Sequence, residues 1–252
     1  MTTVLAVIDD SPTSTGVLRV AQAWAALLDA RLRSVHVRED DDVGAQVAAD
    51  EVGVALEIRD GEPAGAILEL ASLPGVELLV MGSRRGEVHE RPAGHIAVSV
   101  VERAGVPVLV VPPGAVLPQH GRVRSVLVPL EGSVATTTCM GPLLRRLHDA
   151  GVRLVALHAF SEQDVPRFSD HGVHAEEGLA AAFAGRWCPD APAEVRLRLG
   201  PASAATIDIA ELEDPDAIAL GWAQDLSPGH ASVVRAALQS GTRPVLLVPV
   251  GR

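Results

Sequence analysis

Short runs of apolar, often β-branched residues alternate along the chain with longer stretches that carry apolar residues at helical spacing. In the first such stretch, the apolar positions from Val17 to Leu28 recur three or four residues apart, which predicts a helix with one face packed on a sheet. Thr13 and Ser14 are expected to cap its start. The strand-like runs of the first half are Thr3–Ile8, Arg33–Val37, Val54–Ile58, Glu77–Met81 and Val106–Val111.

Several of these runs are apolar at nearly every position, as in VLAVI and VPVLVV. Such runs are typical of strands that are buried on both faces, as in a parallel sheet covered by helices. The pattern therefore predicts an α/β fold, an open and doubly wound parallel sheet of five strands. In sheets of this kind, ligands bind beyond the carboxyl ends of the strands, where the strand order reverses.

The chain also repeats itself, and repeats change how every later feature is interpreted. TVLAVIDDSPTSTGVLR is matched by SVLVPLEGSVATTTCMG, so that Val4 faces Val126 and His36 faces His158 at a common offset of 122. Near the two ends, GVPVLVVPPG matches TRPVLLVPVG at an offset of 137. We expect the additional residues between Ala159 and Ala193, in a longer second helix with its flanking loops.

Proline and glycine residues are concentrated between the two copies, in the segment PPGAVLPQHGR from Pro112 to Arg122. Such a segment continues neither a strand nor a helix, and it is interpreted as a linker. We therefore predict two tandem domains, 1–113 and 123–252, joined by a linker at 114–122.

Composition narrows the class of protein. The 252 residues carry a formal net charge of −11, which disfavours binding to DNA or RNA because such binding depends on clustered basic side chains. There is no run of about 20 apolar residues and no export signal at the N-terminus, so we expect a cytoplasmic protein that does not enter a membrane. Cys139 and Cys188 form no CxxC pair, and neither zinc nor redox chemistry is indicated.

The first copy opens with the strand and Asp-x-Ser turn VLAVIDDSPTS and closes with a strand, loop, helix and strand in VMGSRRG followed by AGHIAVSVVERAGVPVLVVP. In these segments each half resembles the universal stress protein family, and the pair resembles its tandem members. The resemblance implies the fold of adenine nucleotide alpha hydrolase-like domains. Many members bind ATP through the motif G-x-x-G-x9-G-S/T, whose backbone amides hold phosphates at a helix N-terminus.

The first copy keeps part of that motif. Gly82 and Gly94 match its outer glycines with the interval one residue short, Arg85 stands at the middle glycine before Gly86, and His95 replaces the Ser or Thr. His95, Arg84 and Arg85 can donate hydrogen bonds to phosphate, or the two arginines are solvated loop residues that fill the space of a phosphate. The resemblance places the nucleotide-binding residues at Val7, Asp9, Val37, Met81, Gly82, Arg85, Gly86, Gly94, His95 and Ile96.

Asp9 follows the first strand and has two compatible interpretations. In the functional interpretation, Asp9 accepts a hydrogen bond from adenine or ribose; in the structural one, Asp9 or Asp10 caps the Asp-Asp-Ser-Pro turn. The second copy departs further from the motif, because the loop between its glycines, WAQDLSP, is four residues shorter than its counterpart. We expect that copy to hold no ligand or a smaller one. Its equivalent residues are Glu131, Gly221, Trp222, Gly229 and His230.

Other histidines are given structural interpretations. The equivalent positions of His36 and His158 favour a shared structural role over catalysis, and the repeated Gly-His pairs at His95 and His230 indicate either an anion contact or a helix start. The segment DHGVHAE, which contains Asp170, His171, His174 and Glu176, matches no established metal site and is interpreted as a solvated loop that leads into a helix.

The sequence contains no catalytic motif in a convincing context, so we assign no catalytic and no metal-binding residues. The preferred function is a non-catalytic stress-response regulator that binds ATP or a related nucleotide in its first domain, with Mg²⁺ only as a companion of ATP. The main alternative is an interaction or dimerisation module with two vestigial pockets, which binds an unknown protein partner or a second copy through its closing strands. Nucleotide hydrolysis or transfer is the third hypothesis, and fold alone does not establish it.

Overall fold

The computed structural model describes residues 2–38, 42–83, 93–115, 121–160, 173–188, 191–227 and 229–251. Within them, strands and helices alternate in two similar halves, which we call the first and second domains. The first domain consists of β1 (Thr3–Ile8), α1 (Ser14–Leu27), β2 (Arg31–Arg38), α2 (Val43–Val52), β3 (Leu56–Asp60), α3 (Pro63–Ala71), β4 (Val76–Gly82), α4 (His95–Val101) and β5 (Val108–Val111). The second consists of β6 (Ser125–Pro129), α5 (Val134–Asp149), β7 (Arg153–Phe160), α6 (Val173–Trp187), β8 (Glu194–Leu199), α7 (Ala202–Glu213), β9 (Ala217–Trp222), α8 (Ser232–Ser240) and β10 (Val245–Pro249).

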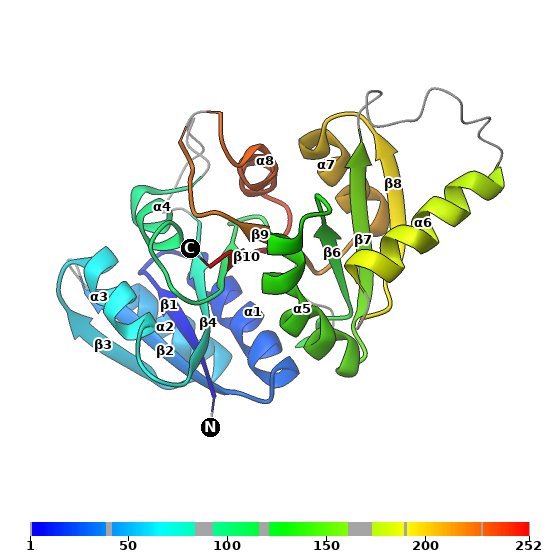
Figure 1. Ribbon diagram of the computed structural model, residues 1–252. Coiled ribbons are helices and arrows are strands. Elements are labelled where there is room, and N and C mark those ends of the chain that lie inside the picture. The colour runs from blue at the N-terminus through cyan, green and yellow to red at the C-terminus, as the bar shows by residue number, and fades with distance from the viewer. Residues whose placement is uncertain are drawn as a thin grey trace.

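The strands of both domains lie in one sheet, in the order β3-β2-β1-β4-β5-β10-β9-β6-β7-β8 (Figure 1). Neighbouring strands within each domain are parallel, which confirms the predicted doubly wound α/β fold. The two domains meet where β5 and β10 pair antiparallel, with Leu109 opposite Leu246. The five-stranded sheets predicted for the two tandem domains are therefore joined into one, because the apolar closing strands pair with one another.

Alternate residues of the strands supply two apolar cores, one on each face of the sheet. Val4 and Ala6 of β1 face the core covered by α1, α2, α5 and α6, whereas Leu5 and Val7 face the core covered by α3, α4, α7 and α8. Each core receives residues from both domains, so the packing is continuous across the seam. Buried Trp24 of α1 is the one large aromatic side chain of the first domain's described residues.

The repeat predicted from the sequence is visible in the element lengths. Helix α6 has 15 residues and its counterpart α2 has 10, so the longer second helix is confirmed. The boundary between the domains stays a prediction because residues 116–120 of the linker lie outside the described chain. Thr13 is the N-cap residue of α1, as predicted, but its side chain accepts no hydrogen bond from the helix, and the hydroxyl of buried Ser14 is bonded to Asp9.

Helices also fasten the two domains. Arg146 of α5 donates to Glu77 Oε2 at 2.6 Å and to the backbone carbonyl of Leu28, both in the first domain. In the part of the chain that the structure describes, no helix is long and apolar enough to cross a membrane.

Candidate functional site

The first domain contains a pocket of about 210 Å³ at the carboxyl ends of β1 and β4. The strand order of that domain reverses between these two strands, because β1 is followed in the chain by β2 on one side and β4 lies on the other. The pocket thus occupies the topological switch point at which doubly wound sheets bind ligands. It is open on one side, and helices α1, α3 and α4 contribute its walls.

Eight of the ten residues predicted for this site line the pocket. Four of them bring apolar surface or main chain close to the cavity from the strand ends: Val7, Val37, Met81 and Gly82. The others are Asp9, Gly94, His95 and Ile96. Arg85 and Gly86 lie outside the described residues.

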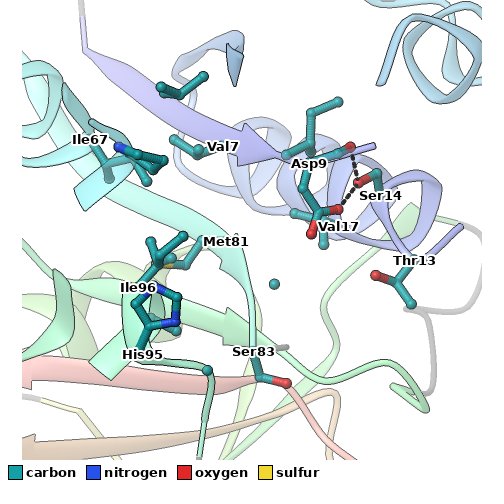
Figure 2. Close-up of a pocket in the computed structure, with 16 residues that line it drawn as sticks. Val7, Asp9, Thr13, Ser14, Val17, Ile67, Met81, Ser83, His95 and Ile96 are labelled. Atoms are coloured by element: carbon teal, nitrogen blue, oxygen red, sulfur yellow. Dashed lines mark hydrogen bonds between the residues drawn. The ribbon is translucent and has the colours of Figure 1, made fainter. Parts of the chain in front are cut away.

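The pocket has an apolar end and a polar end (Figure 2). In the view of Figure 2, apolar side chains gather on the left, namely those of Val7, Ile67, Met81 and Ile96. The oxygen-bearing side chains of Asp9, Thr13 and Ser14 lie on the right together with Val17, and His95 lies on the left beside Ile96. An arrangement of this kind suits a ligand with a flat apolar part and a polar part.

Asp9 organises the polar end. Its Oδ1 accepts hydrogen bonds from the Ser11 amide at 3.0 Å, from Ser11 Oγ at 2.5 Å and from Ser14 Oγ at 3.0 Å. Among the described residues, none donates to Oδ2, which is left to accept from a ligand. The turn-capping role predicted for Asp9 is thereby confirmed, and its ligand-binding role stays a prediction.

Helix α4 presents its first turn to the same pocket. Gly94 caps this helix with extended backbone and donates its own amide to the Ser83 carbonyl at 2.7 Å, which ties the helix start to the end of β4. The amides of residues 95–97 come first in the helix and have no acceptor within it. They are suited to an anionic group of a ligand.

Sequence reasoning did not single out Ile67, Thr13 or Ser83 for this site. Ile67 belongs to the apolar face of α3, and that face can be recognised from spacing, but which end of the sheet it covers depends on the fold. Ser83 could have been predicted as a site residue, because it directly follows Gly82 in the sequence. Its side chain is buried and lies at the pocket (Figure 2).

The second domain has a smaller pocket of about 180 Å³ at the equivalent place, and Glu131 and Gly221 line it. Glu131 Oε1 accepts from Ser133 Oγ at 2.7 Å and from Thr136 Oγ1 at 2.9 Å. Ser133 and Thr136 stand 122 residues after Ser11 and Ser14, so the hydrogen-bond network around Asp9 is repeated.

The other three residues predicted for the second site, Trp222, Gly229 and His230, do not line this pocket, and their ligand-binding role stays a prediction. Trp222 is 5% exposed and packs in the apolar core. His230 is exposed and lies 3.6 Å from Asp225. The reason is the shortened loop, after which α8 begins at Ser232, so Gly229 does not cap the helix as Gly94 does.

The paired histidines have the structural role that their equivalence predicted. His36 Nδ1 is 3.0 Å from the Ile8 carbonyl, and His158 Nδ1 is 3.0 Å from the Leu130 carbonyl. Each imidazole therefore links the ends of two neighbouring strands. In the second domain, the ring of His158 also stacks on Phe183.

The described residues contain no cluster of three or more side chains able to hold a metal ion. This statement does not extend to the segment DHGVHAE, which was interpreted above as a solvated loop. Asp170 and His171 lie outside the described residues, and nothing is described of the side chains of His174 and Glu176.

Comparison with known proteins agrees with the geometry. Residues 44–112, which run from α2 to the end of β5, match the model of the Universal stress protein family. Residues 44–112 are thus similar to this family. Universal stress proteins of Mycobacterium tuberculosis and Mycobacterium bovis are 33% identical to it over 159 residues, which make up 58% of this chain and 52% of theirs. The chain thus spans about half the length of these curated relatives.

Solved structures extend the likeness in fold to both domains. A universal stress protein from Archaeoglobus fulgidus covers 98% of this chain and is itself covered to 98%, with a TM-score of 0.67 and 14% identity. A functionally unknown protein from Pseudomonas aeruginosa covers 98% of this chain, with a TM-score of 0.64 and 13% identity. The resemblance read from the sequence, a universal stress protein fold present twice in tandem, is confirmed.

Proposed function

We propose that the protein is a non-catalytic stress-response regulator whose first domain binds ATP or a related adenine nucleotide. The observation that carries this proposal is the pocket at the switch point between β1 and β4, which gathers an apolar end, a carboxylate and the free amides of a helix start. Family membership supports the stress-response role.

A nucleotide fits this arrangement in one orientation. A purine lies between Val7, Met81 and Ile96, where burial of a flat ring is favourable. A ribose hydroxyl donates to Asp9 Oδ2, and phosphate oxygens accept from the first amides of α4 and from His95. Mg²⁺ would enter with the phosphates, because Asp9 is the one carboxylate among the described lining residues.

Turnover is not part of the proposal. The described lining residues include one carboxylate, Asp9, and one imidazole, His95, and both are used in the binding orientation above. Phosphate release that is lost in His95→Ala while ATP binding is retained would contradict the non-catalytic assignment.

Isothermal titration with ATP and with adenosine tests the binding claim. Asp9→Asn keeps the size of the side chain and removes its charge, so we expect affinity to fall about tenfold, the value of one hydrogen bond to a charged group. Glu131→Gln makes the same change in the second domain and is the matched control, for which we expect unchanged affinity. No heat and no thermal shift at millimolar ATP would refute nucleotide binding, and an equal loss in both variants would place the ligand elsewhere.

The alternative of an interaction module with two vestigial pockets rested on the apolar closing strands. Those strands are β5 and β10, and they pair with one another inside the chain. Val108 and Leu246 are accordingly buried. The structure thus offers an internal explanation for the feature that favoured this alternative, and nucleotide binding is the function we propose.

A further inference from the structure

The shortened loop of the second domain rests on helix α4 of the first. Gln224 follows β9, and its side-chain amide donates to the carbonyls of Val101 at 3.2 Å and Ala104 at 2.8 Å. Two residues later, the amide of Leu226 donates to Glu102 Oε1 at 3.1 Å. The shortened loop therefore makes three hydrogen bonds to the first domain.

These bonds satisfy groups that a helix end leaves open. The last carbonyl oxygens of a helix accept no hydrogen bond from within the helix, and in α4 these include the carbonyl of Val101. Gln224 uses both hydrogens of its amide on two such carbonyls, one in the last turn and one just beyond it. It thus acts as a C-terminal cap supplied by the other domain.

The backbone at Gln224 indicates that this contact holds the loop in an unfavourable conformation. Its φ is +59°, in the left-handed region that residues other than glycine rarely adopt. Such a conformation persists where the surrounding contacts outweigh its cost. The contacts at this place are the two hydrogen bonds to Val101 and Ala104, the hydrogen bond from the Leu226 amide to Glu102, and the burial of Leu226.

The braced helix also forms a wall of the ligand pocket. His95, Ile96 and Ala97 of α4 line the pocket of the first domain, and His95 also lines a groove between the domains together with Asp225 and Ser227. Helix α4 therefore lies between the candidate nucleotide and the docked loop. Its seven residues form only about two turns, so we expect a displacement of its C-terminal end to displace its first turn as well.

We propose that Gln224 is a positioning residue for the first domain's pocket, through which the second domain holds α4 in the orientation that presents residues 95–97 to the ligand. The positioning of α4 follows from the contacts themselves, and its effect on nucleotide affinity rests on the proposed function. The second domain thus contributes to the pocket of the first, although all the described residues that line this pocket belong to the first domain.

The test compares Gln224→Ala, which removes the donors, with Gln224→Glu, which keeps the size but places a carboxylate against carbonyls at the negative end of a helix. Gln239→Ala, an exposed glutamine on α8, is the matched control. Hydrogen–deuterium exchange of residues 98–104 is measured without nucleotide, and ATP affinity is measured by titration. We expect exchange about tenfold faster in Gln224→Ala and faster still in Gln224→Glu, with the control unchanged, because two hydrogen bonds are lost.

ATP affinity should fall about fivefold in Gln224→Ala and further in Gln224→Glu, within the usual range of coupling between sites. Exchange in α4 that does not change, or an alanine variant as damaging as the glutamate variant, would overturn the proposal. Wild-type protein that binds no ATP would refute the proposed function, and the exchange measurement would then decide alone whether Gln224 positions the helix. Normal α4 exchange combined with weakened ATP binding would also overturn it, because the effect would not pass through the helix.

Discussion

Replacement of glycine by alanine should destabilise the protein at Gly221 but not at the equivalent position, Gly82. Gly82 ends β4 and Gly221 lies in β9 at the corresponding place, and neither has a positive φ. A Cβ at Gly82 would meet the Val17 side chain at 3.6 Å, an ordinary contact distance. A Cβ at Gly221 would lie 3.0 Å from Cys139 Sγ, 3.1 Å from Thr136 Cγ2 and 3.3 Å from Met140 Cγ.

The magnitude follows from these contacts. All three neighbours of Gly221 come from helix α5, which must shift to admit the methyl group, and overpacking of this kind costs about 1–3 kcal/mol. Burial raises the pKa of the Cys139 thiol, so it stays neutral and the conflict is steric. Replacement of glycine also removes freedom from the unfolded chain, which stabilises by about 0.4–1 kcal/mol. Gly82→Ala should therefore be neutral or slightly stabilising, and Gly221→Ala destabilising by about 1–2 kcal/mol.

Thermal unfolding of the full chain, followed by circular dichroism, measures the difference between the two variants. A gap of about 2 kcal/mol corresponds to about 4–8 °C in the unfolding midpoint for a chain of this size. Cys139→Ala combined with Gly221→Ala should recover part of the loss, because the closest of the three contacts is removed. Equal midpoints for Gly82→Ala and Gly221→Ala would refute the packing argument.

Two further predictions concern charge. Hydrogen bonds from Arg153 lower the pKa of Glu194 from 4.5 to about 2, so the stabilisation by this carboxylate is present above pH 4.5 and is lost as the pH falls toward 2. In urea titrations above pH 4.5, the free energy of unfolding of wild type should exceed that of Glu194→Gln by under about 1 kcal/mol, because the pair is exposed, and this difference should vanish across that window. A difference that does not change with pH would contradict the ion pair. Val108→Asp should destabilise by at least about 3 kcal/mol, because it puts an unpaired charge at the buried seam between β4 and β10, whereas Val134→Asp at a 72% exposed position should change stability by less than about 0.5 kcal/mol. Similar urea midpoints for the two aspartate variants would contradict the seam.

Most of the fold could be predicted from the sequence because its signals are local and occur twice. The buried run at Thr3–Ile8 was predicted with the observed bounds, whereas the run at Val54–Ile58 is shifted, since β3 spans Leu56–Asp60. The shift has a physical basis, because β3 is an edge strand whose partly exposed residues give a weak apolar pattern. That β5 pairs with β10 depends on contacts between residues far apart in the chain, and no local pattern determines it.

The site was predictable where side chains follow a strand end. Asp9 and Gly82 were predicted from the family resemblance, and they meet in the pocket because each stands at the carboxyl end of one of two neighbouring parallel strands. Trp222 was predicted in the same way, since it also follows a strand glycine, but its indole is large and apolar, and it is buried in the core. Gln224 carried no signal in the sequence, because its partners Val101 and Ala104 lie more than a hundred residues away and offer only backbone carbonyls.

The antiparallel pairing of β5 with β10 has a consequence for how the two halves can differ. Two separate copies that met through this seam would form a symmetric dimer, in which any substitution appears on both sides at once. In a single chain the partners are always present at the same high effective concentration, and each can change alone. The first domain has an open pocket at Gly82 and Gly94, whereas the loop after Gly221 in the second domain is shorter and contacts the first domain. Covalent linkage thus permits a division of labour that a symmetric pair does not.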